Sequence, residues 1–153
     1  MEALRGYLQF HLDTARQRVR IDTEPDSEFK GADGQVVALF LSNPSAYQAT
    51  EQGAGRWTFQ VARALKVRIF TTDTGDHGSD RTRLLFKHWA FETKVLNVLL
   101  AGKFREFGWN KPPAPVSDKS QTQHTRVLAG GLQSELAFEI VYTAAIEQEN
   151  LPV

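Results

Sequence analysis

Two stretches of the chain carry apolar residues at the spacing of an amphipathic helix. The first covers residues 1 to about 18, with one apolar face that includes Leu4, Leu8 and Leu12. The second begins at Ser79 or Asp80, either of which can cap a helix, and runs to about residue 103. Its wide apolar arc contains Leu84, Leu85, Trp89, Phe91, Val95, Leu96, Val98 and Leu99, and Glu92 lies outside most of it.

Other stretches have the pattern of β-strands. Residues 35–42 form a continuous apolar run, which suits a strand covered on both faces or one at a subunit contact. Residues 57–72 alternate between apolar and polar and predict one long strand, or two strands with a bend near 62–64. A short strand is expected at 126–129. Residues 133–148 predict a final strand longer than a domain of this size needs, so one end is expected to lie in an interface.

The segments between these elements are rich in turn-forming residues. Residues 22–34 predict an exposed connection, and mobile loops are expected near 43–56 and 109–125. Arg16, Arg18 and Arg20 would form a small basic cluster at the end of the first helix. The chain is therefore predicted to be one α+β domain over residues 1–153. Its single mixed or antiparallel sheet would be packed by an N-terminal helix and a long central helix.

Composition narrows the chemistry that the chain can perform. The 18 basic residues balance the 18 acidic residues, so no net field draws the protein toward nucleic acid or membranes, and copies repel one another little. Cysteine is absent, which excludes disulfides and thiolate ligands. No apolar run is long enough to cross a bilayer. We therefore expect cytoplasmic synthesis, no membrane partner and no sequence-specific nucleic-acid binding.

One polar cluster contains groups that bind metals. Asp73, Asp76, His77 and Asp80 follow the second long strand and precede the central helix, so a metal-dependent enzyme is one alternative reading. Their spacing does not match a calcium-binding EF-hand loop. Aspartate and glycine are common in turns, and a polar turn that ends in a helix cap is the favoured interpretation. No metal site is assigned.

A second candidate is a histidine with a glutamate one helical turn later, His88 and Glu92. Zinc proteases need two histidines on such a helix, and this helix has one. A polar pair on the helix face is favoured. No catalytic or cofactor-binding residue is assigned, and the protein is expected not to be an enzyme. Trp57 and Trp109 border the two predicted loops, where each could anchor a protein partner or cover a sheet edge.

Four segments resemble one family in their order along the chain. They are the helix MEALRGYLQFHL, the strand VVALFLS with the loop that ends in GAGRW, the block LKVRIFTTDTGD with the helix DRTRLLFKHWAFETKVLNVLL, and the strand LAFEIVYTAAIE. This arrangement covers most of the chain and resembles the tail terminator, or tail completion, proteins of tailed phages.

The resemblance implies a structural virion protein that is made in the host cytoplasm and forms a hexameric ring with itself. The ring would cap the tail tube protein, stop tube growth and present the docking surface for a neck or head-completion protein. No catalysis and no cofactor are implied. Another phage neck, tube or baseplate component is the alternative. The residues expected at interfaces are Tyr47, Gln52, Arg56, Trp57, Trp109, Phe138, Tyr142 and Ile146.

Overall fold

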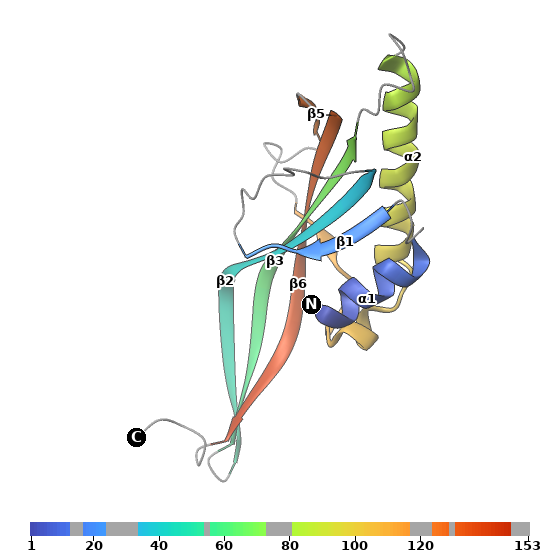
Figure 1. Cartoon of the computed structure of the whole chain (residues 1–153). Coiled ribbons are helices and arrows are strands. Elements are labelled where there is room, and N and C mark those ends of the chain that lie inside the picture. The colour runs from blue at the N-terminus through green and yellow to red at the C-terminus, as the bar shows by residue number, and fades with distance from the viewer. Residues whose placement is uncertain are drawn as a thin grey trace.

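The computed structural model describes residues 1–12, 17–23, 34–53, 56–72, 81–116, 124–128 and 131–147. In these residues, two α-helices accompany a mixed sheet of six strands, which confirms the predicted α+β class (Figure 1). The elements are α1 (Glu2–His11), β1 (Gln17–Ile21), β2 (Gln35–Gly53), β3 (Arg56–Thr72), α2 (Arg81–Leu99), the 3-10 helix η1 (Phe104–Phe107), β4 (Ala114–Pro115), β5 (His124–Leu128) and β6 (Gly131–Glu147).

Three long strands form the centre of the sheet. The strand order is β1-β2-β3-β6-β4, and β5 also pairs with β6. Only β1 runs parallel to its neighbour, and the other described pairs are antiparallel. β3 pairs with β6 over its whole length, from Arg56 opposite Glu147 to Thr72 opposite Gly131. The alternation in 133–148 therefore corresponds to one continuous strand, as predicted.

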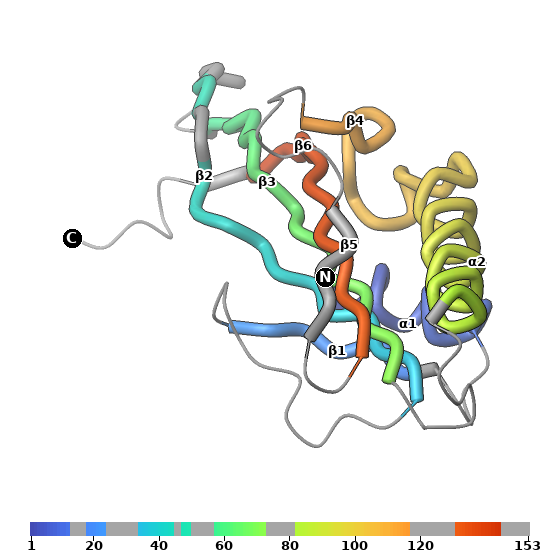
Figure 2. Tube along the Cα trace, turned by 90° about the horizontal axis from the view of Figure 1, so that it is seen from above, coloured from blue at the N-terminus to red at the C-terminus, as the bar shows by residue number. Residues whose placement is uncertain are grey.

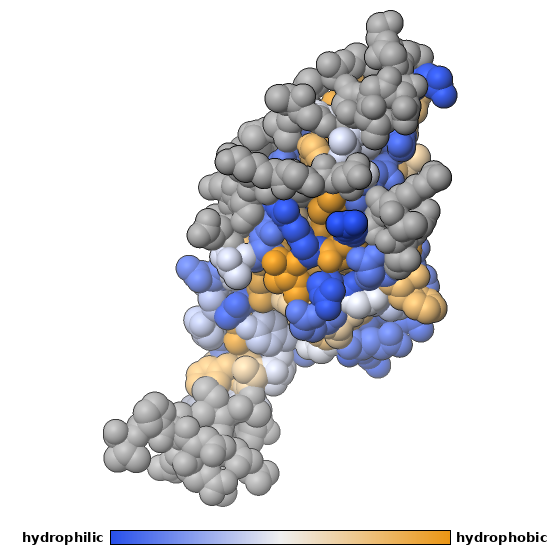
Figure 3. All heavy atoms as spheres, in the orientation of Figure 1, coloured by the Kyte–Doolittle hydropathy of each residue, from blue (hydrophilic) through white to orange (hydrophobic). Residues whose placement is uncertain are grey.

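The long strands pass through two regions with different surroundings. In the body, α1 and α2 pack on one face of the sheet (Figures 1 and 2). Beyond it, the other halves of β2, β3 and β6 continue as a narrow three-stranded arm, which comprises residues 46–53, 56–62 and 141–147. Figure 3 shows the described side chains of the body in space-filling form, with polar and apolar residues side by side on this face.

The hydrophobic core lies between the two helices and one face of the sheet. Alternate residues of β3, namely Leu65, Val67 and Ile69, are fully buried there, and Val95 of α2 belongs to the same core. Burying side chains of this size stabilises the fold by about 1.5–3 kcal/mol each. The core continues through Leu4, Leu8, Val37, Leu39, Phe91, Leu99, Leu136, Phe138 and Ile140. On β3, the alternating residues Arg68 and Phe70 are buried on the opposite face and lie outside this core cluster.

The first helix is shorter than predicted, because α1 ends at His11 and the chain then forms β1. Burial of Val19 in the core stabilises this strand, and the Gln9 side-chain oxygen accepts a hydrogen bond from the Val19 N–H at 2.8 Å. The expected basic cluster at a helix end is therefore corrected. Arg18 and Arg20 lie on β1, while Arg16 lies outside the described residues.

The predicted loop at 43–56 is also corrected, because β2 continues to Gly53 and pairs with β3 as far as Gly53 opposite Arg56. The register shifts on both sides of Pro44, which has no N–H to give to the ladder. Ser42 compensates there: its Oγ accepts from the Ala64 N–H at 3.1 Å and donates to the Ala64 oxygen at 3.0 Å. The connection at 54–55 lies outside the described residues.

The predicted loop at 109–125 is partly ordered against the edge of β6. Trp109 forms a bridge with Tyr142, and the Asn110 N–H donates to the Val141 oxygen at 2.7 Å. β4 pairs farther along, and the Val116 N–H donates to the Ala137 oxygen at 3.0 Å. Residues 117–123 lie outside the described part, and the segment's last two residues begin β5.

A buried charge cluster fixes the end of β1 to the centre of the sheet. The Arg68 guanidinium lies 2.7 Å from the Asp22 carboxylate, and both side chains are more than nine-tenths buried. The Arg20 guanidinium lies 2.9 Å from the same carboxylate. Two cations therefore share this carboxylate, and Asp22 offsets part of the positive charge that is buried here.

Candidate interaction surface

The arm presents aromatic side chains without a layer of helices over them. Tyr47 of β2 is 66% exposed, and Trp57 at the start of β3 is 39% exposed. The strand register places Tyr47 level with Val61 and Tyr142, and it places Phe59 level with Ala144. Residues directly opposite one another share a face of the sheet, so these side chains lie on the same face. The arm therefore carries an aromatic face that is continuous with the core.

The base of the arm is better packed than its outer part. Val61 is buried, and Tyr142 packs against the core cluster. The Arg63 guanidinium carbon lies 5.8 Å from the centre of the Tyr142 ring, within the range of a cation–π contact. From this base outward, burial decreases and cross-strand contacts are the main stabilisation that remains.

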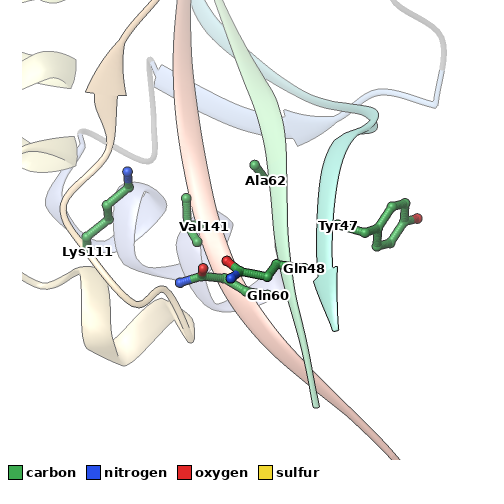
Figure 4. A pocket seen from close by; sticks show the side chains of 6 residues that line it. All are labelled: Tyr47, Gln48, Gln60, Ala62, Lys111 and Val141. Atoms are coloured by element: carbon green, nitrogen blue, oxygen red, sulfur yellow. The ribbon is translucent and has the colours of Figure 1, made fainter. Parts of the chain in front are cut away.

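An open groove of about 460 Å³ lies at the base of the arm (Figure 4). Gln48 and Gln60 are opposite one another in the ladder, and Lys111 approaches from the segment beside β6. The Tyr47 ring points away from these groups (Figure 4). The Lys111 ammonium lies 3.6 Å from the Glu139 carboxylate. The groove therefore offers amide and ammonium hydrogen-bonding groups, and Ala62 and Val141 complete its lining.

The arm has an unpaired edge on each side within the described residues. β1 covers the outer edge of β2 only over 35–39. On β6, the last contacts at the outer edge are the Trp109 bridge to Tyr142 and an Asn110 side-chain hydrogen bond to Thr143 Oγ1 at 2.8 Å. No other described residue pairs with these two edges, so their backbone groups are available to another strand.

The expected interface residues fall into three groups. Tyr47 and Trp57 are exposed on the arm, and Tyr142 is half-buried at its base. Gln52, Arg56 and Ile146 belong to arm strands, but their side chains lie outside the described part of the structure.

For the third group, the expected place at an interface is corrected. Trp109 and Phe138 are buried in the body. The ring centres of Trp109 and Phe107 lie 5.1 Å apart. Trp109 and Phe138 both belong to the hydrophobic core cluster. Gly108, with φ of 82°, ends η1 and directs the chain back onto β6. Because the protein's own core covers Trp109 and Phe138, neither offers an exposed anchor to a partner.

A buried polar network connects α2 to the sheet. His88 is completely buried; its Nδ1 lies 2.8 Å from Thr71 Oγ1, and its Nε2 lies 2.7 Å from Ser134 Oγ. Gln35 Nε2 donates to Thr71 Oγ1 at 3.4 Å, which leaves the threonine hydroxyl hydrogen free to go to Nδ1. Both ring nitrogens of His88 therefore have a hydroxyl partner in either neutral tautomer.

Burial lowers the pKa of His88 to about 4, so the ring is neutral near pH 7. A Glu92 oxygen lies 3.9 Å from His88 Nε2, beyond hydrogen-bonding distance, and Glu92 is itself buried. The prediction that Glu92 lies outside the buried face of α2 is thus corrected. Ser134 and His88 resemble part of a hydrolase triad, but both are completely buried and cannot meet a substrate in this structure. Their network ties helix to sheet.

The helix α2 also carries an exposed aromatic pair that the sequence pattern did not indicate. Phe86 and Trp89 are both exposed, and their ring centres lie 6.0 Å apart in an edge-to-face arrangement. The prediction that Trp89 belongs to the buried arc is corrected. Leu84, His88, Phe91, Glu92, Val95 and Leu99 form the buried stripe of α2. The stripe was obscured because two of its positions hold polar residues.

The polar cluster whose groups could bind a metal, Asp73, Asp76, His77 and Asp80, lies outside the described residues. Among the residues that the structure does describe, no group of three or more His, Asp or Glu side chains is placed to hold a metal ion. Neither described helix has the length and apolarity that crossing a membrane requires.

No family model matches the sequence, and no curated protein matches it significantly. The architecture of the chain and the resemblance of its four segments are therefore the basis for proposing a function.

Proposed function

We propose that this protein is a structural component of a phage-like particle that assembles into a ring and caps the tail tube. The ring ends tube growth and presents the surface to which the head or neck docks. Its partners are further copies of itself, the tube protein and a neck or head-completion protein. The protein acts through its surfaces, without catalysis or a cofactor.

The arm is the observation that carries the proposal. Three strands extend beyond the helices, and Tyr47 and Trp57 remain exposed on them. A small three-stranded ribbon buries little apolar surface by itself, so it gains stability by contact with another molecule. An assembly protein uses such a projection to reach its neighbours.

Two further properties support an assembling role. The sequence has zero formal net charge, so identical copies approach without strong repulsion. The body also exposes Phe86 and Trp89 on α2. This helix lies beside the body, away from the arm (Figure 1). Two separate apolar surfaces on one protomer allow each copy to contact more than one neighbour, as a ring requires.

The test combines native mass spectrometry and electron microscopy of the purified full-length chain, alone and with the tube protein of its own particle. We expect closed rings, and tubes that stop growing once the ring is bound. A chain that stays monomeric and leaves tube length unchanged would contradict the proposal.

A pair of matched variants assigns the result to the arm. Trp57→Ser removes an exposed aromatic side chain from the arm, and Phe10→Ser removes one that is 82% exposed on α1. We expect the arm variant to lose rings and the α1 variant to keep them. Circular dichroism must show that both variants are folded.

A further inference from the structure

We infer that the arm recognises a second copy of this chain by adding strands edge to edge, with β2 of one copy parallel to β6 of the next. The segments that meet are residues 48–53 of β2 and residues 143–147 of β6. This inference rests on the proposed ring and specifies how its subunits are joined.

The two open edges of the arm lie at the same level along its length. Gln48 and Thr143 are both opposite Gln60 of β3, and Gly53 and Glu147 are both opposite Arg56. The outer edge of β2 and the outer edge of β6 are therefore open at the same height along the arm. If neighbouring copies are related by a rotation about an axis parallel to the arm, β2 of one copy lies level with β6 of the next. No shift along the strands is needed.

The two edges of the arm carry few of the features that normally protect an edge strand. Native sheets block exposed edges with lysine, proline, bulges or very short strands. Residues 46–53 (AYQATEQG) and 143–147 (TAAIE) contain neither lysine nor proline. The bulges around Pro44 lie nearer the body, and a further register shift falls at the tip, between Glu51 and Gly53. Between them, the pairing from Ala46 opposite Ala62 to Glu51 opposite Trp57 is regular. Both edges are therefore competent to pair.

Strand direction determines the kind of contact. β2 and β6 are each antiparallel to β3, so they run in the same direction within one copy. Pairing β2 with a neighbour's β6 is then parallel and joins two different surfaces, which lets the contact repeat around a closed ring. Pairing β6 with β6, or β2 with β2, would instead give a two-fold dimer. The first arrangement pairs both edges of every copy with a single kind of contact.

The absence of cysteine makes this geometry directly testable. In Gln48→Cys/Thr143→Cys, the two thiols of one copy are separated by β3, about 10 Å between Cα atoms. A disulfide needs Cα atoms closer than about 7 Å, so it cannot form within that arm. Between copies paired as inferred, the same positions are adjacent. Mild oxidation should then produce a ladder of covalent oligomers on a non-reducing denaturing gel.

Single variants and a displaced pair serve as controls. Gln48→Cys alone and Thr143→Cys alone should not cross-link, and Asn97→Cys/Thr143→Cys, with one thiol on the exposed surface of α2, should give no ladder. Ala46→Cys/Thr143→Cys and Thr50→Cys/Thr143→Cys detect a pairing that is displaced by two residues. Covalent dimers from either single variant would overturn the inference in favour of a two-fold contact.

The outcome also separates this inference from the proposed function. If microscopy shows rings but none of the three arm cysteine pairs gives covalent oligomers, the proposed ring is supported and the edge pairing is overturned. A monomer with no ladder would overturn both. A ladder that ends at the mass of the native ring supports both.

Discussion

β3 passes through both regions of the molecule and meets a different environment in each. In the body, Leu65 is completely buried beneath the helices, between β2 and β6. Eight residues earlier, in the arm, Trp57 has the same two neighbouring strands but remains 39% exposed. The hydrogen-bonded ladder is the same in the two regions, whereas the layer of helices is present only in the body.

This difference shows which interactions stabilise each region. The body is held by burial of apolar side chains, the largest favourable contribution to folding. The arm is held by its ladder and by cross-strand pairs that contribute roughly 0.2–1 kcal/mol each. We therefore expect the body to determine the global stability of the protein and the arm to respond mainly to a partner.

The largest effect on the free energy of unfolding is expected when one β3 residue of the body and one of the arm are each replaced by alanine. Leu65→Ala should lower the free energy of unfolding by about 3 kcal/mol, since it leaves a cavity in a closed core. Trp57→Ala should cost under about 1 kcal/mol in the isolated protomer, because that side chain is already partly exposed. Urea unfolding of both variants measures the contrast. Equal losses would show that the arm is packed as tightly as the body.

The second prediction tests the polar network of the body through pH. The unfolded chain takes up a proton on histidine near pH 6.5, and folded His88 does so only near pH 4. Its contribution is therefore fully present above pH 6.5, and it is lost as the pH falls from 6.5 towards 4. The loss should reach about 3 kcal/mol at the acid end of this window.

The measurement is urea unfolding at several pH values, compared with His88→Asn, which cannot titrate. That variant should be less stable at neutral pH and should lack this part of the pH dependence. His11→Asn changes an exposed histidine and is the matched control. If His11→Asn altered the profile as much as His88→Asn, the assignment to the buried network would fail.

The third prediction concerns the buried charges at the end of β1. Asp22→Asn removes the carboxylate that Arg68 and Arg20 share and should cost about 2 kcal/mol in thermal or urea unfolding. Glu135→Gln breaks a more exposed pair with Lys66, separated by 3.7 Å, and should cost under about 0.5 kcal/mol. A similar loss in both variants would mean that burial adds nothing to the Asp22 cluster.

The fourth prediction follows the two regions by hydrogen exchange in the monomer. Amides of residues 57–61 should exchange at least about tenfold faster than those of residues 65–69, since the arm opens without breaking the core. Addition of the tube protein or ring formation should slow the arm amides and leave the body amides unchanged. Uniform protection along β3 would erase the distinction between the two regions.

The smallest expected effect is a stabilisation of the body. Gly6 lies within α1, and a Cβ built there meets nothing within 4 Å. Gly6→Ala should add about 0.5–1 kcal/mol to the free energy of unfolding, because alanine favours the helix more than glycine does. Exchange of the arm amides should not change. Slower arm exchange in this variant would show that the two regions open together.

Much of the fold was predictable where one face of an element is buried. The strand expected at 133–148 is observed at Gly131–Glu147, and the helix expected to run from residue 79 or 80 to about 103 is observed at Arg81–Leu99. The loop predicted at 43–56 failed because its glycines and Pro44 indicate turns locally. Its pairing depends instead on β3 and on the Ser42 hydrogen bonds to Ala64, which are distant in sequence.

The candidate surface was only partly predictable. Tyr47 and Trp57 were expected at an interface and are exposed on the arm, while the similar expectation for Trp109 failed. Both tryptophans border glycine- or proline-rich segments, so local sequence treats them alike. Pairing of residues 109–116 with β6 places the Trp109 side chain in the core. No local feature of the sequence specifies that contact.

The sequence by itself determined the α+β class, the two helices and the long final strand, because periodicity records which side of an element is buried. Only the tertiary structure decided that three strands continue past the helices as an arm. It also placed His88 and Glu92 inside the body and Trp89 outside it. These outcomes depend on which distant segments cover a residue, and the local pattern misleads where a buried position holds a polar residue or an exposed position holds an aromatic one.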